Sequence, residues 1–318
     1  MKTRKIAIIG LGAVGKNVAY ALLLKGLADE LLLVDTDTAK VEAECQDLRD
    51  AMSYCPYAAT VNTAAYEDLG DCDIIIVSVG NMKLLLETMD RLDELNFNIA
   101  QVNDFIPKVM AGGFKGIIIN ISNPCDIITS QVAKLSGLPL GHVFGTGTGL
   151  DTSRLISLLA KQTGIAHRSI TACMMGEHGA AIMVPWSIVS FCGKPLAELA
   201  KADERFRFDH YAFRKKAEEN AYLVLRGKHC TEYGIATTAS RVVELVLHDE
   251  HAIMPASMLQ QGEYGVSGVF AGVPCMIGRN GVEEIIRYDL PEDELKEFRK
   301  CCESIRNNMK KNDSVLNW

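Results

Sequence analysis

A glycine-rich turn near the start of the chain has the spacing of phosphate-binding loops. Residues 10–15 read Gly-Leu-Gly-Ala-Val-Gly and lie between an apolar run at residues 5–9 and a helical segment at residues 12–25. In this pattern the first glycine permits a tight turn, the second lets the backbone approach a pyrophosphate, and the third lets the helix pack closely on the strand. Glycine turns also join strands to helices in proteins that bind no nucleotide, so the pattern alone does not decide whether this turn binds a dinucleotide.

An acidic residue closes the second apolar run. Asp35 directly follows residues 30–34, which read Glu-Leu-Leu-Leu-Val. In dinucleotide-binding folds a carboxylate at this place accepts hydrogen bonds from the adenosine ribose, and it would repel the extra ribose phosphate of NADP. The alternative is that Asp35 only caps the following helix. The order of strand, glycine turn, helix, strand and acid favours a site for NAD.

Two polar segments further along the chain are hard to explain as parts of a hydrophobic core. Residues 145–154 read Gly-Thr-Gly-Thr-Gly-Leu-Asp-Thr-Ser-Arg, and residues 175–179 read Met-Gly-Glu-His-Gly. Histidine titrates near neutral pH, so His178 could accept and donate a proton in a reversible reaction. A lone histidine is more often structural, but the flanking glycines indicate close approach of the backbone to a ligand. Asp151 and Arg154, three residues apart on a predicted helix, share one face.

These segments, together with the glycine turn and residues 121–124 (Ile-Ser-Asn-Pro), make the chain similar to the L-lactate and malate dehydrogenase family over nearly its full length. Within that family it most resembles the L-2-hydroxyisocaproate dehydrogenases, at residues 80–84 (Gly-Asn-Met-Lys-Leu) and 145–148 (Gly-Thr-Gly-Thr). The resemblance implies an NAD-dependent enzyme that transfers a hydride between nicotinamide and C2 of a small L-2-hydroxy acid.

The resemblance also implies roles for individual residues. His178 would be the proton donor and acceptor, and Asp151 the carboxylate that orients its ring, although Asp151 could also cap a helix. Arg154 would bind the substrate carboxylate through its planar fork, and Arg91 would polarise the substrate carbonyl, unless it is a solvated surface charge. The implied substrate contacts are Asn123, Thr231 and Leu84. The implied cofactor contacts are Gly10, Gly12, Val14, Gly15, Asp35, Gly80, Asn81, Ser122, Asn123, Thr146 and Ile235, and no metal is implied.

Two departures from the family pattern concern the surroundings of the site. Ala180 and Ala181 stand where polar residues usually follow Gly-Glu-His-Gly, which puts some supporting hydrogen bonds in doubt. His229 and Cys230 precede Thr231 in place of the more familiar glycine and tyrosine. The effect of both departures on the pocket is left open.

Two other functions stay open at this point. A dinucleotide-binding protein that has lost catalysis would lack a reacting residue, whereas all four matching residues are present. A malate dehydrogenase would need a second cation in the loop before Arg91, where residues 81–89 offer only Lys83. Measuring NAD reduction with L-malate, L-lactate and L-2-hydroxyisocaproate would distinguish these functions.

The order of the expected elements predicts how these residues are positioned. Short apolar runs alternate with helical segments up to residue 146, which predicts a doubly wound parallel sheet, a Rossmann domain, over residues 1–146. After residue 146, helical segments are mixed with β-prone stretches, which predicts a mixed α+β catalytic domain over residues 147–318. The expected strands are residues 5–9, 30–34, 74–79, 116–121, 170–175 and 268–277. The expected helices are residues 12–25, 39–52, 90–110, 152–162 and 211–226.

Composition narrows the class of protein. A chain of 318 residues exceeds one ordinary hydrophobic core, in keeping with two domains. A net charge of -7 without a basic patch argues against a nucleic-acid partner, and no apolar run is long enough to span a membrane. Ten scattered cysteines without Cys-x-x-Cys spacing indicate a reduced, cytoplasmic compartment. The family resemblance implies a homodimer or homotetramer.

Overall fold

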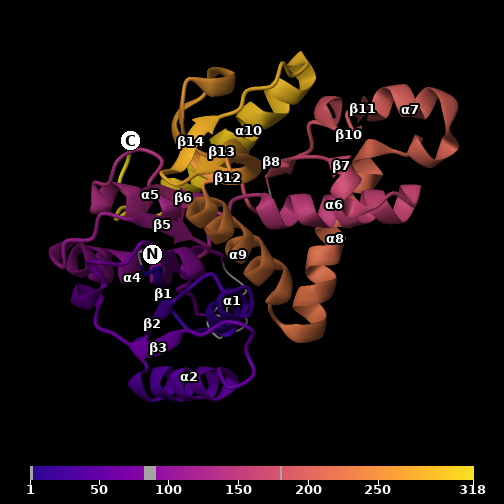
Figure 1. Ribbon diagram of the computed structural model, residues 1–318. Coiled ribbons are helices and arrows are strands. Elements are labelled where there is room, and N and C mark those ends of the chain that lie inside the picture. The colour runs from indigo at the N-terminus through magenta and orange to yellow at the C-terminus, as the bar shows by residue number, and fades with distance from the viewer. Residues whose placement is uncertain (1–2, 82–90, 180) are drawn as a thin grey trace.

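The first half of the chain builds six parallel strands. The computed structural model describes residues 3–81, 91–179 and 181–318, with the side chains of residues 91 and 92 left out. The strands lie in the order β3-β2-β1-β4-β5-β6, and their runs of Ile, Leu and Val are mostly buried, as expected for a sheet covered on both faces (Figure 1). Their bounds are β1 Lys5–Ile9, β2 Glu30–Val34, β3 Thr60–Thr63, β4 Ile74–Val77, β5 Ile117–Asn120 and β6 Val143–Gly145.

This strand order places a ligand site at one edge of the sheet. The order reverses between β1 and β4, which pair in parallel from Ile6 with Ile74 to Ile9 with Val77. In open α/β sheets, ligands bind beyond the carboxyl ends of the strands at such a reversal. The helices of this half are α1 Ala13–Leu24, α2 Thr38–Ala51, α4 Arg91–Ala111 and α5 Cys125–Ser136.

The second half continues the same sheet with antiparallel strands. Ser257 of β12 pairs with Gly145 of β6, and the sheet then runs through β13, β8 and β9, with β14 also paired to β13. One hydrophobic core extends from Ile6 to Val315 through both halves. The bounds are β8 Met175–Gly176, β9 Ile182–Met183, β12 Ala252–Gln261, β13 Ser267–Gly278 and β14 Gly281–Ile285, with helices α9 Tyr233–His248 and α10 Glu292–Met309.

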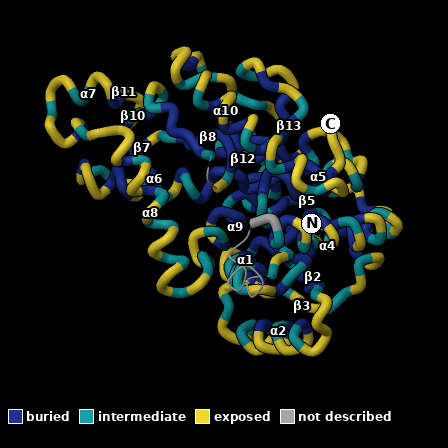
Figure 2. Tube along the Cα trace, turned by 180° about the vertical axis from the view of Figure 1, so that it is seen from behind, coloured by how far each residue is buried: buried dark blue, intermediate teal, exposed yellow. Residues whose placement is uncertain are grey.

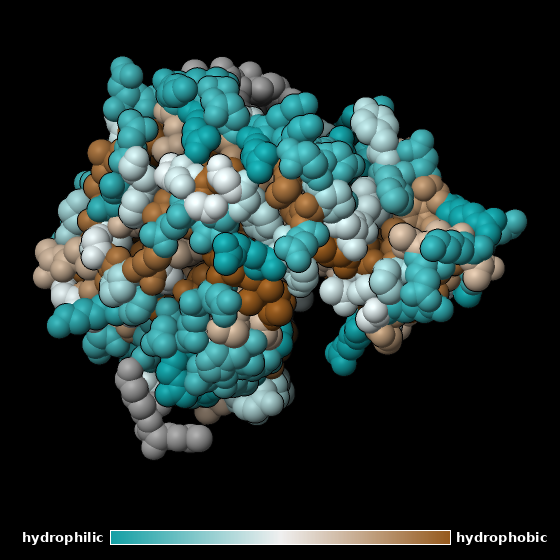
Figure 3. All heavy atoms as spheres, turned by 90° about the horizontal axis from the view of Figure 1, so that it is seen from above, coloured by the Kyte–Doolittle hydropathy of each residue, from teal (hydrophilic) through white to brown (hydrophobic). Residues whose placement is uncertain are grey.

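The rest of the second half forms a lobe with a core of its own. This lobe core includes Leu155, Phe191 and Phe213, from three different elements. The lobe projects from the main body, and a space-filling view shows a hollow between the two (Figures 1 and 3). Its elements are α6 Gly149–Thr163, α7 Leu196–Ala202 and α8 His210–Lys228, with a small antiparallel sheet of β7 Ile170–Thr171, β10 Ser190–Phe191 and β11 Lys194–Pro195.

One expected strand is two strands in different sheets. Residues 170–175 split into β7, which lies in the small sheet, and β8, which lies in the main sheet. Between them, the N–H of Met174 donates to Thr152 Oγ1 at 2.8 Å and its carbonyl accepts from Thr148 Oγ1 at 2.5 Å. Because side chains of Thr152 in α6 and of its N-cap Thr148 take both backbone groups, the ladder is interrupted at Met174.

The burial pattern follows these layers. The central strands are buried along most of their length, whereas α2, α7 and α8 carry long exposed stretches (Figure 2). Within the described residues, we find no helix with the length and apolar character needed to cross a membrane.

Candidate active site

The glycine turn has the geometry of a dinucleotide cradle. Gly10 has a φ of +95°, and a Cβ there would lie 2.5 Å from the carbonyl oxygen of Ser78. A Cβ on Gly15 would lie 2.0 Å from the carbonyl oxygen of Gly10, so larger residues are excluded at both positions. A Cβ on Gly12 would meet nothing within 4 Å, which leaves open space at the N-terminus of α1. These residues therefore fit a bound pyrophosphate.

Asp35 supports this turn from the end of β2. Its Oδ2 accepts from the backbone N–H of Leu11 at 2.7 Å and lies 3.3 Å from Lys40 Nζ. Although burial opposes ionisation, these partners and the N–H of Asp37 hold the pKa of Asp35 below its usual value. The side chain that caps α2 is Asp37, so the interpretation of Asp35 as only a helix cap is wrong.

Two other predicted cofactor residues directly follow strands of the same sheet. Ser122 follows β5 and is buried, with its Oγ 3.3 Å from the carbonyl oxygen of Val77. Thr146 follows β6, and its N–H donates to the carbonyl oxygen of Asn120 at 3.0 Å. The cofactor roles of five further residues stay predictions. They are Val14 in α1, Gly80 and Asn81 after β4, Asn123 before α5, and Ile235 in α9.

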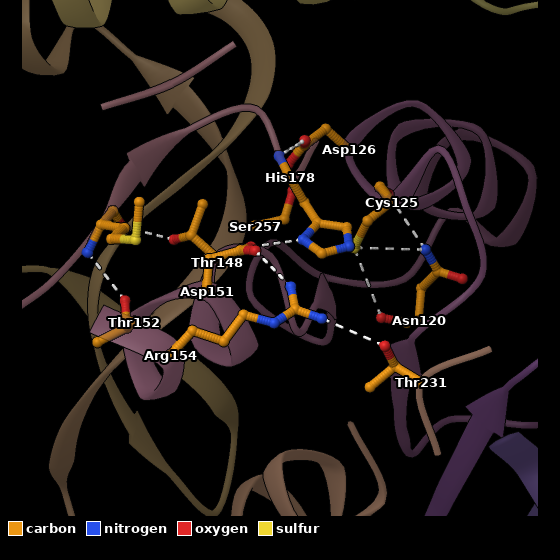
Figure 4. A network of polar contacts seen from close by, with 11 residues as sticks. Asn120, Cys125, Asp126, Thr148, Asp151, Thr152, Arg154, His178, Thr231 and Ser257 are labelled. Carbon is orange, nitrogen blue, oxygen red and sulfur yellow. Dashed lines mark hydrogen bonds and ion pairs between the residues drawn. The ribbon is translucent and has the colours of Figure 1, made fainter. Parts of the chain in front are cut away.

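His178, Asp151, Arg154 and Thr231 form one connected network (Figure 4). His178 Nδ1 lies 2.6 Å from Asp151 Oδ2. Arg154 donates to Asp151 Oδ1 at 3.0 Å and to Thr231 Oγ1 at 3.2 Å. These four predicted site residues therefore lie together, although Asp151 and Thr231 are 80 positions apart in the sequence. Thr148 is the N-cap of α6, so Asp151 lies in the first turn of that helix and is not its cap.

The charges of this network stabilise one another. Burial lowers the pKa of His178, but the Asp151 carboxylate outweighs burial and raises it above its ordinary value. Burial likewise opposes ionisation of Asp151, yet His178 and Arg154 hold the pKa of Asp151 below its usual value. The two groups therefore favour each other's charged form: Asp151 favours the protonated ring of His178, and His178 favours the ionised carboxylate of Asp151.

Two predicted residues cannot be placed in this way. Leu84 lies outside the described residues. Arg91 is the first residue of α4, and its side chain is outside the described part of the chain. In the same helix, Asn98 is buried and its Nδ2 donates to the carbonyl oxygen of Asn123 at 2.6 Å. This bond links the helix that begins at Arg91 to the segment that follows β5.

The sequence analysis missed two residues that contact this network. Asp126 of α5 accepts from the backbone N–H of His178 at 2.9 Å, and Ser257 of β12 donates to Asp126 at 2.5 Å. The available signal was a charged residue inside the apolar start of α5, in the run Cys-Asp-Ile-Ile. A charge in a buried helix face is rarely without a partner.

His229, which stands where the family pattern has glycine, adopts a backbone conformation that favours glycine. His229 is the C-cap of α8 and has a φ of +66°, a left-handed conformation that glycine adopts without steric penalty. The family's glycine at this place suits that conformation better than histidine does.

Comparisons with known sequences match both halves of the chain. The NAD-binding domain model of lactate/malate dehydrogenases matches residues 4–145, and the alpha/beta C-terminal domain model matches residues 148–315. The chain is 38% identical to an L-lactate dehydrogenase of Fusobacterium nucleatum over 304 residues, covering 95% of each chain. It is 39% identical to L-lactate dehydrogenase 2 of Listeria innocua over 312 residues, covering 98% of this chain and 99% of the relative.

Solved structures give the same result in three dimensions. The ligand-bound minor L-lactate dehydrogenase of Enterococcus mundtii matches with a TM-score of 0.92 and 35% identity, over 96% of this chain and 97% of that one. Its ligand-free form matches with a TM-score of 0.86 and 32% identity, over 97% of each chain. The glycine cradle, the His178 network and the match across both halves have one explanation: the chain belongs to the lactate/malate dehydrogenase family.

Proposed function

We propose that this chain catalyses the reversible, NAD-dependent interconversion of a small 2-keto acid and the corresponding L-2-hydroxy acid. The observation that carries the proposal is the network of His178, Asp151 and Arg154. In this network Asp151 links His178, which can gain and lose a proton, to Arg154, whose charge suits a substrate carboxylate. The same chain has a glycine turn that fits a dinucleotide. Relatives named L-lactate dehydrogenase support an acid of this size.

The proposed roles follow from which atoms are already engaged. NADH supplies the hydride when it is bound, and NAD accepts it in the reverse direction. His178 Nδ1 is held by Asp151, so Nε2 is the nitrogen that would donate a proton to the substrate oxygen during reduction. Arg154 would bind the substrate carboxylate with its planar fork. Because the pKa of His178 is raised, its ring stays protonated to a higher pH than an ordinary histidine does. The rate of reduction should therefore fall, and the rate of oxidation rise, as pH increases through that pKa.

We further propose that residues 1–146 bind the cofactor and residues 147–318 supply the proton donor and the carboxylate-binding arginine. The ten cysteines are all free thiols, which supports a reduced, cytoplasmic location. Exposed Tyr211, Tyr222 and Leu223 on α8 offer apolar surface to a second copy, in a homodimer or homotetramer. Light scattering of the purified protein would measure that state.

The cofactor prediction rests on Asp35. We expect NAD to be strongly preferred over NADP, because a ribose phosphate would approach a largely buried, ionised carboxylate. The Asp35→Ser variant should lose most of this preference. The Asp37→Ser variant should keep it, because serine can still cap α2 and the carboxylate at the end of β2 is left in place. Steady-state kcat/KM with each cofactor checks this. Equal efficiency of the unaltered enzyme with both cofactors would contradict it.

The substrate prediction rests on the resemblance at residues 82–86, which read Met-Lys-Leu-Leu-Leu and lie outside the described residues. In the family, a residue of this loop faces the side chain of the substrate, where Gln suits a methyl group and Arg a carboxylate. Leu84 would favour an aliphatic chain at about 0.8 kcal/mol for each buried methylene, or on the order of 2 kcal/mol for three carbons. The alternative is that these leucines pack on the protein and leave a lactate-sized pocket.

We therefore expect 2-ketoisocaproate to be reduced at least as efficiently as pyruvate, and both far better than oxaloacetate. NADH absorbance with the three acids measures this directly. The Leu84→Gln variant should move the preference toward pyruvate, while Leu84→Met should leave it nearly unchanged. A clear preference for oxaloacetate would instead identify Lys83 as the second cation of a malate dehydrogenase. Cofactor binding without turnover of any acid would favour the non-catalytic dinucleotide-binding protein.

A further inference from the structure

Asp126 is a buried carboxylate that the proposed reaction does not use. It lies in the first turn of α5 and is 2% exposed. No lysine or arginine of the described ranges forms an ion pair with it. Burial of an unpaired carboxylate is costly and persists only where hydrogen bonds and nearby dipoles compensate. The N-terminal end of α5 supplies one such dipole.

The two oxygens of Asp126 have separate partners. Oδ2 accepts from the backbone N–H of His178 at 2.9 Å, and Oδ1 accepts from the hydroxyl of Ser257 at 2.5 Å (Figure 4). These partners come from the segment after β8 and from β12, which are 52 and 131 residues away in sequence. Asp126 therefore fixes the main chain of His178 to the central sheet, whereas Asp151 fixes its ring.

Other charged groups around His178 come from several elements. Asp151 and Arg154 face it from α6, and Asp126 faces it from α5. Its chain neighbour Glu177 is held by Ser304 and Asn308 of α10, at 3.1 and 3.0 Å. Two negative groups and one positive group therefore act on the imidazole from α5 and α6.

We propose that Asp126 is a positioning residue of the reaction, which anchors the backbone of His178 and supplies a second negative charge that favours its protonated ring. Asp151 contributes most to the raised pKa of His178, and Asp126 adds to it. Burial in turn raises the pKa of Asp126 to about 6, while Ser257 and His178 oppose that rise. The inference rests on the proposed role of His178 as proton donor and acceptor.

The Asp126→Asn variant separates charge from geometry. Its amide oxygen can still accept from the His178 N–H, and its amide nitrogen can donate to Ser257 Oγ, so the anchor persists without the charge. We expect the His178 titration to shift to lower pH, and the pH midpoints of reduction and oxidation to shift with it, with unchanged NADH affinity. Asp126→Ala removes the anchor as well and should lower kcat by about ten- to a hundredfold, the range expected for a displaced catalytic group.

Two serine variants keep the test decisive if Asp126 variants fail to fold. Ser257→Ala removes one donor from the carboxylate, which raises the pKa of Asp126 and weakens its charge, so the His178 titration should shift the same way by less. Ser130→Ala is the matched control, because Ser130 is also buried on α5 but accepts from Trp318 Nε1 instead, at 2.8 Å. It should leave the titration unmoved.

NMR titration of the imidazoles reads His178 without turnover. The chain has seven histidines, and the signal that disappears in His178→Gln identifies the one of interest. An unmoved His178 titration in folded Asp126→Asn, or in Ser257→Ala if the former does not fold, overturns the inference. A titration that shifts as expected while activity does not follow it would overturn the proposed function and leave the inference standing.

Discussion

His178→Gln should lower turnover by about two to four orders of magnitude, the usual contribution of a general acid or base, while NADH still binds. Glutamine can occupy the space but cannot donate a proton to the substrate oxygen or accept one from it. The cradle at Gly10 and Gly15 is formed by other segments, so cofactor affinity should be retained. Stopped-flow reduction of a 2-keto acid and fluorescence titration with NADH measure the two quantities.

A surface histidine provides the control for that experiment. His248 ends α9, and its side chain is 50% exposed. The His248→Gln variant should turn over like the unaltered enzyme. If His178→Gln also kept near-normal turnover, the proton would have to come from another group and the assignment of His178 would be wrong.

Arg154→Lys should reduce kcat/KM for any 2-keto acid by about 2–5 kcal/mol of binding free energy, or roughly 30- to several-thousandfold. Lysine keeps the charge but presents a point donor in place of a planar fork, so it cannot bind a carboxylate through two parallel hydrogen bonds. Arg154 also donates to Asp151 and Thr231, so the loss should include poorer placement of the carboxylate that holds His178.

The matched control is Arg279→Lys, since Arg279 pairs with Asp249 on an exposed surface. Little change is expected there. The measurement is steady-state kinetics at several keto acid concentrations, with NADH affinity determined separately. A small effect confined to kcat, with unchanged KM, would show that Arg154 does not bind the substrate carboxylate.

Much of the parallel half of the fold was predictable because its signals are local, although the short strands β3 and β6 and the helix α5 were not predicted. The strands β1 and β2 agree with the expected bounds at both ends, since each is a continuous apolar run followed by a turn or an acid. By contrast, β12 pairs over most of its length with β13 and meets β6 at a single residue pair. Such a partner choice depends on three-dimensional contacts that periodicity does not record, and β12, α9 and α10 were not predicted.

The residues of the site likewise divide into those that the sequence predicted and those that it did not. The motif residues His178, Asp151 and Arg154 were predicted because the resemblance rests on them. Asp126 was not. A charge in an apolar run indicates a buried partner, but the sequence does not show that this partner is the backbone N–H of His178. The interruption at Met174 was missed for a similar reason, because its backbone groups bond to the side chains of Thr152 and Thr148, at the start of α6 and at its N-cap.

The pairing of Gly145 with Ser257 makes the main sheet continuous across the two halves of the chain. Asp126 accepts hydrogen bonds from both Ser257 and the backbone N–H of His178, and it thereby links His178 to this sheet. The strand ladder therefore sets the separation between the phosphate cradle and the proton donor when the chain folds. The conformational entropy of aligning these two parts is lost at folding, before any ligand arrives, and binding need not supply it.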